Sequence, residues 1–103
     1  MRAISIKRYW AEQVMDGTKR EEYRGWQTKH RGPLAIHASG PGGALLGVVE
    51  VVGCRWDARR GCYAWQLARP RRLAAPLPCK GKQKFWSVPA EHLPALEALA
   101  AAA

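Results

Sequence analysis

The sequence predicts a small domain of the α+β class: a mixed or antiparallel β-barrel with an early helix and a short C-terminal helix. The chain has 103 residues, which is enough for a single modest hydrophobic core. Short apolar runs recur between Gly and Pro residues, a spacing typical of strands. One early stretch has the four-residue apolar spacing of a helix instead. We therefore expect one domain over residues 1–103, built as a rolled sheet.

The first two predicted elements are a strand over residues 3–6 and a helix over residues 9–16. Trp10 and Val14 lie four residues apart, which places them on one helical face turned toward the core. Gly17 follows and supplies a left-handed C-cap.

The middle of the chain predicts an antiparallel sheet. Residues 34–38 form an apolar run that ends in the glycine-rich loop 39–43. Residues 44–52 are the longest apolar run and rich in Val, which indicates a central strand. Residues 57–61 look like a hairpin connection into an alternating strand over residues 62–67.

The last third of the sequence mixes prolines, basic residues and a final apolar stretch. Prolines between residues 69 and 78 predict an edge strand or an extended connection. A basic turn over residues 80–84 then leads to a last strand over residues 85–88. Leucines spaced along residues 94–103 indicate the C-terminal helix.

The charge balance points to a polyanionic partner, for which nucleic acid is the default. Seventeen Lys and Arg face eight Asp and Glu, which gives a formal charge of +9. A solvated basic surface is the alternative interpretation. Five tryptophans add aromatic faces of the kind that stack on bases, although most should belong to the core. Trp26 is the first choice for such a stacking platform and Trp86 the second.

Cysteine usage and hydropathy predict a soluble, cytoplasmic protein in a reducing compartment. The three cysteines form no Cys-x-x-Cys pair, so we expect no disulfide framework, no metal site and no cofactor. Cys54 and Cys62 could face each other across the hairpin, or be an accidental pair of thiols. No apolar run resembles a signal peptide or a membrane span, so we expect no membrane partner. The size fits a monomer.

The segment 17–24 concentrates the chemistry-bearing side chains. It holds Lys19, Glu22 and Arg24 directly after the predicted helix. A regular strand would point Lys19 to one face and the other two to the opposite face. A turn or bulge near Thr18 would bring Lys19 and Glu22 to the same opening.

The order of motifs resembles the ASCH domain, a PUA-like family of small barrels that handle RNA and modified bases. The resemblance spans nearly the whole chain and is closest to the branch of the endothelial-overexpressed lipopolysaccharide-associated factors. The motifs that carry it are Ile4-Ser5-Ile6-Lys7, Gly17-x-Lys19-x-x-Glu22-x-Arg24 with Trp26, Ile36-His37-Ala38, Gly47-Val48-Val49-Glu50, Arg69-Pro70 through Pro76-Leu77-Pro78, Lys80-Gly81 and Phe85-Trp86-Ser87-Val88-Pro89.

The resemblance implies a cleft, with Lys19, Glu22 and Arg24 at its floor, that binds RNA or a nucleoside. Some small ASCH proteins hydrolyse the amide of N4-acetylcytidine, and others are linked to cleavage of single-stranded RNA. In the amidohydrolases a threonine nucleophile stands at the position of Glu22, beside a lysine that matches Lys19. This chain is closer to the members that keep a glutamate.

The site residues allow catalytic and structural interpretations. Lys19 could act as a base, with Glu22 or Glu50 orienting it or activating water. Lys19 and Glu22 could instead form a structural ion pair, or Lys19 could contact phosphate. Glu50 lies in an apolar run and needs a partner, for which Lys19 or Arg24 are the expected choices.

Further residues are predicted to contact a ligand. Arg24 suits a phosphate or a base edge, or an ion pair with a glutamate. His37 could be an acid or base, or a hydrogen-bonded structural residue. The predicted ligand-binding set is Lys7, Arg24, Trp26, His37, Ser39, Lys80, Lys82 and Trp86.

The sequence leaves three classes of function open. The first is binding of RNA or a modified nucleoside. The second is hydrolysis, of acylated cytidine before single-stranded RNA, since no pair of histidines is evident for a ribonuclease. The third is a basic protein-interaction module.

Overall fold

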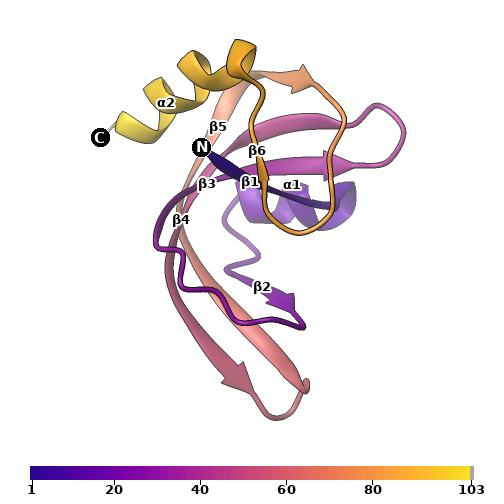
Figure 1. Ribbon diagram of the computed structural model, residues 1–103, viewed down its shortest axis with the longest axis vertical. Helices are drawn as coiled ribbons and strands as arrows, with labels where there is room; N and C mark the ends of the chain where they lie inside the picture. The colour runs from indigo at the N-terminus through magenta and orange to yellow at the C-terminus, as the bar shows by residue number, and fades with distance from the viewer. Residues whose placement is uncertain (103) are drawn as a thin grey trace.

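A computed structural model describes residues 1–102 as a curved sheet with two helices packed against it (Figure 1). The strands are β1 (Arg2–Lys7), β2 (Glu21–Arg24), β3 (Gly32–Ser39), β4 (Ala44–Asp57), β5 (Cys62–Pro78) and β6 (Trp86–Ser87). The helices are α1 (Arg8–Met15), the 3-10 turn η1 (Ala90–His92) and α2 (Leu93–Ala101). The predicted early helix, late helix and α+β class are confirmed.

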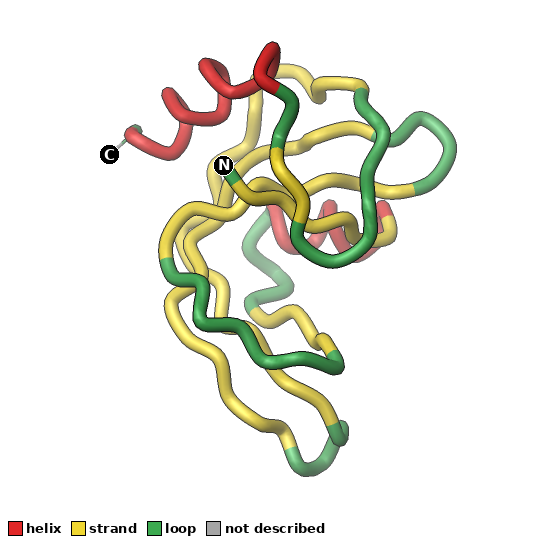
Figure 2. Tube along the Cα trace, in the orientation of Figure 1, coloured by secondary structure: helices red, strands yellow, loops and turns green. Residues whose placement is uncertain are grey.

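The sheet is mixed, as predicted. Its strand order is β2-β5-β4-β3-β1-β6, and only the β1–β3 pair is parallel. A parallel pair needs a crossover connection, which α1 and β2 provide between the two strands. The tube view shows the strands with loops at the rim of the sheet (Figure 2).

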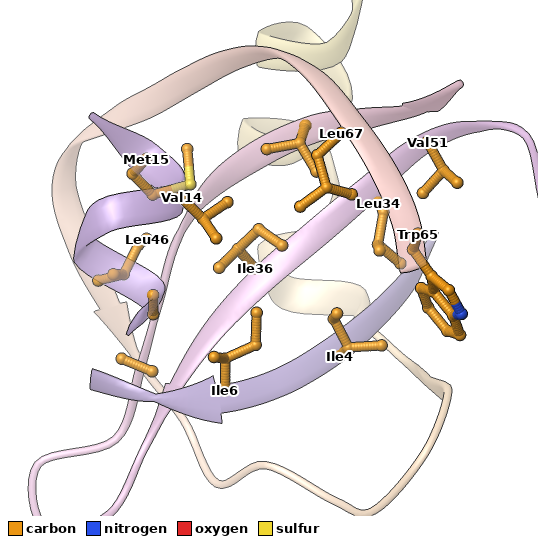
Figure 3. Close-up of a cluster of buried hydrophobic side chains, with 13 residues drawn as sticks. Ile4, Ile6, Val14, Met15, Leu34, Ile36, Leu46, Val51, Trp65 and Leu67 are labelled. Carbon is orange, nitrogen blue, oxygen red and sulfur yellow. The ribbon is translucent and has the colours of Figure 1, made fainter. Parts of the chain in front are cut away.

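The main core lies where α1 covers the curved sheet (Figure 3). Val14 and Met15 of the helix meet apolar side chains of β1, β3, β4 and β5, such as Ile36 and Leu67. A second cluster, which includes Leu45, packs beneath α2. Each fully buried aliphatic side chain contributes roughly 1.5–3 kcal/mol, so these two clusters hold the sheet in its curved shape.

Aromatic side chains join the two ends of the sheet and give it a barrel-like form. β2 and β6 are the terminal strands. Trp26, just after β2, packs edge-on against Phe85, just before β6, with ring centroids 5.1 Å apart. Trp65 packs against Trp26 at 4.6 Å and donates its indole N–H to the Trp26 carbonyl. Closure therefore rests on side-chain packing, and Trp26 is part of it.

The helical face that contacts the core differs from the predicted one. The buried residues of α1 are Ala11, Val14 and Met15. Trp10 is 46% exposed, so the prediction that it faces the core is wrong. Ala11 takes the core-facing position beside it, and the Trp10 indole lies on the more exposed face of the helix.

The proline-containing segment continues β5 as one long strand. β2 pairs with β5 only over residues 63–66, so the side of β5 that faces β2 has no strand partner farther along. Prolines are tolerated there because that edge needs no backbone donor. The predicted edge location is confirmed, although the strand is continuous with the one before it.

The β4–β5 hairpin is longer than predicted and projects from the body of the sheet (Figure 1). Its turn falls at the predicted residues 57–61. Asp57 pairs with Cys62, whereas Cys54 pairs with Trp65. The two cysteines are therefore not opposite each other, and all three cysteines carry free thiols. No helix within residues 1–102 has the length and apolar character needed to cross a membrane.

Candidate functional site

A charged cluster of Lys19, Glu22 and Arg24 lies at the start of β2. Glu22 is buried at 7% exposure. Its Oε1 lies 3.5 Å from Lys19 Nζ, and its Oε2 lies 2.9 Å from an Arg24 terminal nitrogen. A buried carboxylate needs such partners. The structure thus brings together the three residues that the sequence placed at one site.

The turn between α1 and β2 positions Lys19. Gly17 takes a φ of +85°, which ends the helix. The Thr18 backbone N–H donates to Asp16 Oδ1 at 2.9 Å, and the Lys19 N–H donates to the Gln13 carbonyl. Hydrogen bonds from Thr18 lower the pKa of Asp16. The turn brings Lys19 to the same side as Glu22, as expected of a turn near Thr18.

Aromatic rings surround the Lys19 ammonium. Its Nζ lies 4.6 Å from the Tyr23 ring centroid and 5.8 Å from that of Trp10, and it donates to the Glu21 carbonyl. Burial raises the pKa of Tyr23, as does the bond that its hydroxyl donates to Glu21. Lys19 therefore has an acceptor or a ring on each side.

Trp10 and Ser5 are site residues that the sequence reasoning missed, and Trp10 is the one that the sequence could have revealed. It lines the cavity beside Lys19 and Glu22, and nearly half of its side chain is exposed. The signal was present in the sequence, because Ala11, Val14 and Met15 form an i, i+3, i+4 apolar stripe that excludes Trp10.

Two adjoining cavities form a groove. The narrow cavity, about 450 Å³, holds the charged cluster together with Lys7 and Trp10. The wide cavity, about 1070 Å³, lies between the loops 39–43 and 79–84. Ser5 and Arg24 line both cavities, so the two cavities adjoin at these residues. We call the two together the groove.

Arg24 stands at the junction of the two cavities. Besides Glu22, its guanidinium donates to the Ser5 carbonyl at 3.0 Å, which ties β2 to β1. Its Nε is buried and has no hydrogen-bond partner among residues 1–102. The predicted pairing of Arg24 with a glutamate is what the structure shows.

The wide cavity is basic. Lys80, Lys82 and Lys84 line it, and within the described chain no carboxylate lies within 4 Å of any of them. Ser39 and the glycines of the loop after it form the opposite wall. Six members of the predicted ligand-binding set therefore line the groove: Lys7, Arg24, His37, Ser39, Lys80 and Lys82.

His37 and Trp86 are buried in the wall of the groove. His37 is 1% exposed, and its Nε2 lies 2.7 Å from the Cys79 carbonyl. The Trp86 ring packs edge-on against His37 and is 5% exposed. Neither Trp86 nor the half-buried Trp26 lines the groove, so the structure gives no support to the stacking roles predicted for these two tryptophans. Their rings are needed by the core and the barrel closure.

Glu50 lies outside the charged cluster. It pairs with Arg71 at 2.5 Å, and its expected pairing with Lys19 or Arg24 is wrong. The β4–β5 ladder brings Arg71 alongside, since Val48 is opposite Arg71 in the register. Arg71 also donates to the carbonyls of Leu99 and Ala100 at the end of α2. The pair ties the C-terminal helix to the sheet.

The described residues offer no group of three His, Cys, Asp or Glu side chains arranged to hold a metal ion. The groups that line the groove include its cations, the buried Glu22 carboxylate, aromatic rings and the hydroxyls of Ser5 and Ser39.

A comparison with protein families shows which family this chain is related to. The model of the ASCH domain matches residues 4–86, which include the charged cluster and most of the groove. The chain belongs to the ASCH domain family. Among curated protein sequences, no match is found.

Solved structures with the same fold include other ASCH domains. The crystal structure of ASCH from Zymomonas mobilis has a TM-score of 0.75 at 14% identity, with 95% of this chain and 94% of that chain covered. A tyrosine-to-phenylalanine mutant of that protein has a TM-score of 0.76 at 14% identity, with 95% and 96% covered. At this identity the likeness concerns the fold, and it confirms the predicted PUA-like architecture.

Proposed function

We propose that this ASCH domain binds single-stranded RNA or a modified nucleoside in the groove, with the charged cluster at its floor. The observation that carries the proposal is the division of the groove into two unlike cavities that meet at Arg24. One cavity offers lysines without carboxylate partners, and the other offers a buried carboxylate beside aromatic rings. A nucleotide has the same two parts, an anionic phosphate and an aromatic base.

The loop 79–84, which we call the lysine loop, is suited to bind a phosphate backbone. Lys80, Lys82 and Lys84 are flexible cations that face an open cavity, where each can neutralise one phosphate. The glycines opposite them leave room for the chain of sugars and phosphates to approach the protein backbone. This end of the groove would supply affinity without reading the sequence of the RNA.

The narrow cavity suits a base. Trp10 and Tyr23 present ring faces or edges to it, and a base can stack on such surfaces. Glu22 is an acceptor there, and a carboxylate of this kind accepts hydrogen bonds from the exocyclic amino group of cytosine or a related base. Its two cationic partners keep it aligned.

Lys19 is better explained as a positioning residue than as a base in catalysis. Its ammonium already meets the Glu22 carboxylate, the Glu21 carbonyl and two rings. One of its N–H groups donates to the Glu21 carbonyl, and the ion pair and the rings hold the ammonium beside Glu22. The arrangement holds Glu22 in place and favours binding over proton abstraction.

Titration of a short fluorescent single-stranded RNA by anisotropy, at several salt concentrations, tests the proposal. We expect the affinity of the wild-type protein to fall with salt, and the slope to lose about 0.7 for each phosphate contact removed. Replacing Lys80, Lys82 and Lys84 together by Gln should flatten that slope. Lys29→Gln is the matched control, because Lys29 is exposed and lies outside the groove. Equal slopes for both variants would refute the proposal.

Hydrolysis of N4-acetylcytidine is the second candidate, favoured by the presence of Lys19 in a cavity of nucleoside size. Chromatography of N4-acetylcytidine incubated with the wild type and with Lys19→Ala distinguishes the two functions. Deacetylation that disappears in a folded Lys19→Ala variant would identify an amidohydrolase that works with Glu22 in place of threonine. If neither the wild type nor Lys19→Ala deacetylates N4-acetylcytidine, binding is the remaining function of the charged cluster.

A further inference from the structure

We propose that Ser5 and His37 form a nucleophile and general-base pair, which gives the groove an acyl-transfer activity on small esters or amides. This proposal goes beyond binding, because it concerns a hydroxyl that the charged cluster does not use. Ser5 Oγ lies 3.1 Å from His37 Nδ1. A hydroxyl bonded to an imidazole nitrogen is the arrangement that activates a serine for attack on a carbonyl.

The hydrogen bonds around His37 fix which nitrogen accepts. Nε2 lies 2.7 Å from the Cys79 carbonyl oxygen, which can only accept. Nε2 therefore carries the proton, and Nδ1 of the neutral ring has a free lone pair that faces Ser5. The carbonyl plays the part of the third member of a triad, because it holds the ring in one tautomer and one orientation.

A third contact orients the hydroxyl of Ser5. The Trp86 indole N–H donates to Ser5 Oγ at 3.2 Å. That bond occupies one lone pair of the oxygen, so the hydroxyl hydrogen is left to point at Nδ1. The same N–H would stabilise negative charge on Oγ as the proton leaves.

Ser5 is placed where a substrate can reach it. It lines both cavities and is partly exposed, while His37 behind it is fully buried. Gly81 covers the pair so closely that a Cβ there would lie 2.2 Å from Ser5 Oγ and 2.7 Å from the His37 ring. The absence of a side chain at position 81 leaves room for the loop to pass beside Ser5, which stays partly exposed in the wide cavity.

The reaction follows from these contacts. Ser5 Oγ bonds to the carbonyl carbon of the substrate as its proton moves to His37 Nδ1, and the carbonyl electron pair moves onto oxygen. The tetrahedral intermediate collapses, the bond to the leaving group breaks, and that group takes the proton from Nδ1. Water then attacks the acyl ester, gives a proton to Nδ1, and releases the acid as the proton returns to Oγ. Arg24, whose guanidinium donates to the Ser5 backbone carbonyl at the same junction, is the cation that we assign to the oxyanion.

Labelling with a fluorophosphonate, a probe for activated serines, followed by peptide mass spectrometry tests the pair without RNA. The chain has three serines, Ser5, Ser39 and Ser87. We expect the adduct on Ser5 in the wild type, since Ser5 alone of the three is bonded to a histidine within the described residues. An unlabelled Ser5, or label on another serine in its place, would overturn the proposal.

Variants sharpen this test. Ser5→Ala should abolish labelling and the release of nitrophenol from p-nitrophenyl acetate. His37→Gln should slow both by about 100-fold or more, which is the usual contribution of a general base. Ser87→Ala, on the exposed edge strand, should react like the wild type. Circular dichroism shows whether each variant is folded. If Ser5→Ala unfolds, the site of labelling in the wild type still tests whether Ser5 is the activated serine. Equal rates in folded His37→Gln and wild type would reject the pair, while RNA binding is judged separately by the salt titration.

Discussion

At the level of single residues, the tryptophans of this chain differ in what surrounds them. Trp26 and Trp65 pack together at the barrel closure, whereas Trp10 stands at the mouth of the narrow cavity. Spacing along the sequence favoured Trp26 as the stacking residue because it follows the charged cluster directly. The contacts that pack the Trp26 ring at the barrel closure come from Trp65 and Phe85, about 40 and 60 residues farther along the chain.

Replacement of these two tryptophans by alanine should separate binding from stability. Trp10→Ala should weaken RNA binding by roughly 1–3 kcal/mol, the value of one stacked base, and leave the unfolding free energy nearly unchanged. Trp26→Ala should lower the unfolding free energy by about 3 kcal/mol, because it opens a gap among packed rings. Anisotropy and urea denaturation measure the two quantities. A stable Trp26→Ala variant that has lost RNA binding would reverse these assignments.

Much of the candidate site was predictable from local sequence, whereas its long-range partners were not. Lys19, Glu22 and Arg24 lie within six residues, so a turn was enough to predict their grouping. Glu50 was assigned the wrong partner because Arg71 reaches it only through the register of β4 and β5. The role that we propose for His37 depends on Ser5, which lies on the neighbouring parallel strand.

At the level of elements, the long β4–β5 ladder depends on a close approach at Gly47. A Cβ at this position would lie 2.2 Å from the Arg71 carbonyl oxygen and 2.7 Å from Met15 Cε. The register of the ladder shifts next to Gly47. The backbone of β5 could not pass so close to a larger residue, so glycine sets the curvature at this point.

Gly47→Ala should therefore destabilise the protein by about 1–3 kcal/mol, as overpacking of a core does. Gly25→Ala is the matched control, since a Cβ there would meet no atom within 4 Å. Urea denaturation of both variants gives the comparison. Equal unfolding free energies for Gly47→Ala and wild type would show that β4 and β5 are free to separate at this point.

The tip of the β4–β5 hairpin is held by Asp57. Its side chain accepts hydrogen bonds from the backbone N–H groups of Arg59 and Arg60 and pairs with the Arg60 guanidinium at 2.9 Å. The backbone bond from Arg60 is the largest influence that lowers the pKa of Asp57, followed by the Arg60 guanidinium and the Arg59 N–H. The turn is thus stabilised by an ionised carboxylate.

Acid should weaken this hairpin through Asp57. Because the pKa of Asp57 is lower in the folded state than its unfolded value of about 4, the unfolded chain binds the proton more readily. The stabilisation is present above about pH 4 and is lost as the pH falls through the folded pKa. The melting temperature of the wild type should therefore fall more steeply with acid than that of Asp57→Asn.

Glu97→Gln serves as the control for this pH series. Glu97 is exposed on α2 and forms no ion pair within the described chain. The melting temperature of Glu97→Gln should match that of the wild type at each pH. Parallel pH curves for Asp57→Asn and the wild type would mean that Asp57 does not hold the turn.

At the level of the whole molecule, the curved sheet explains why the groove forms where it does. The parallel β1–β3 pair places Ser5 beside His37, and the closing contact between the sheet ends brings Arg24 onto Ser5. The lysine loop between β5 and β6 then covers this junction. Apolar periodicity predicted the strands and the class of fold. The contact between the two ends of the sheet, β2 and β6, depends on Trp26 and Phe85. No local sequence pattern predicts that contact.

A backbone NMR titration with a short single-stranded RNA tests the central claim, which is that the groove is the binding surface. We expect chemical-shift changes concentrated in the turn and strand over residues 19–24 and in the loops 39–43 and 79–84, with α2 unaffected. Shifts confined to the β4–β5 hairpin or to α2, with the groove residues unmoved, would contradict it.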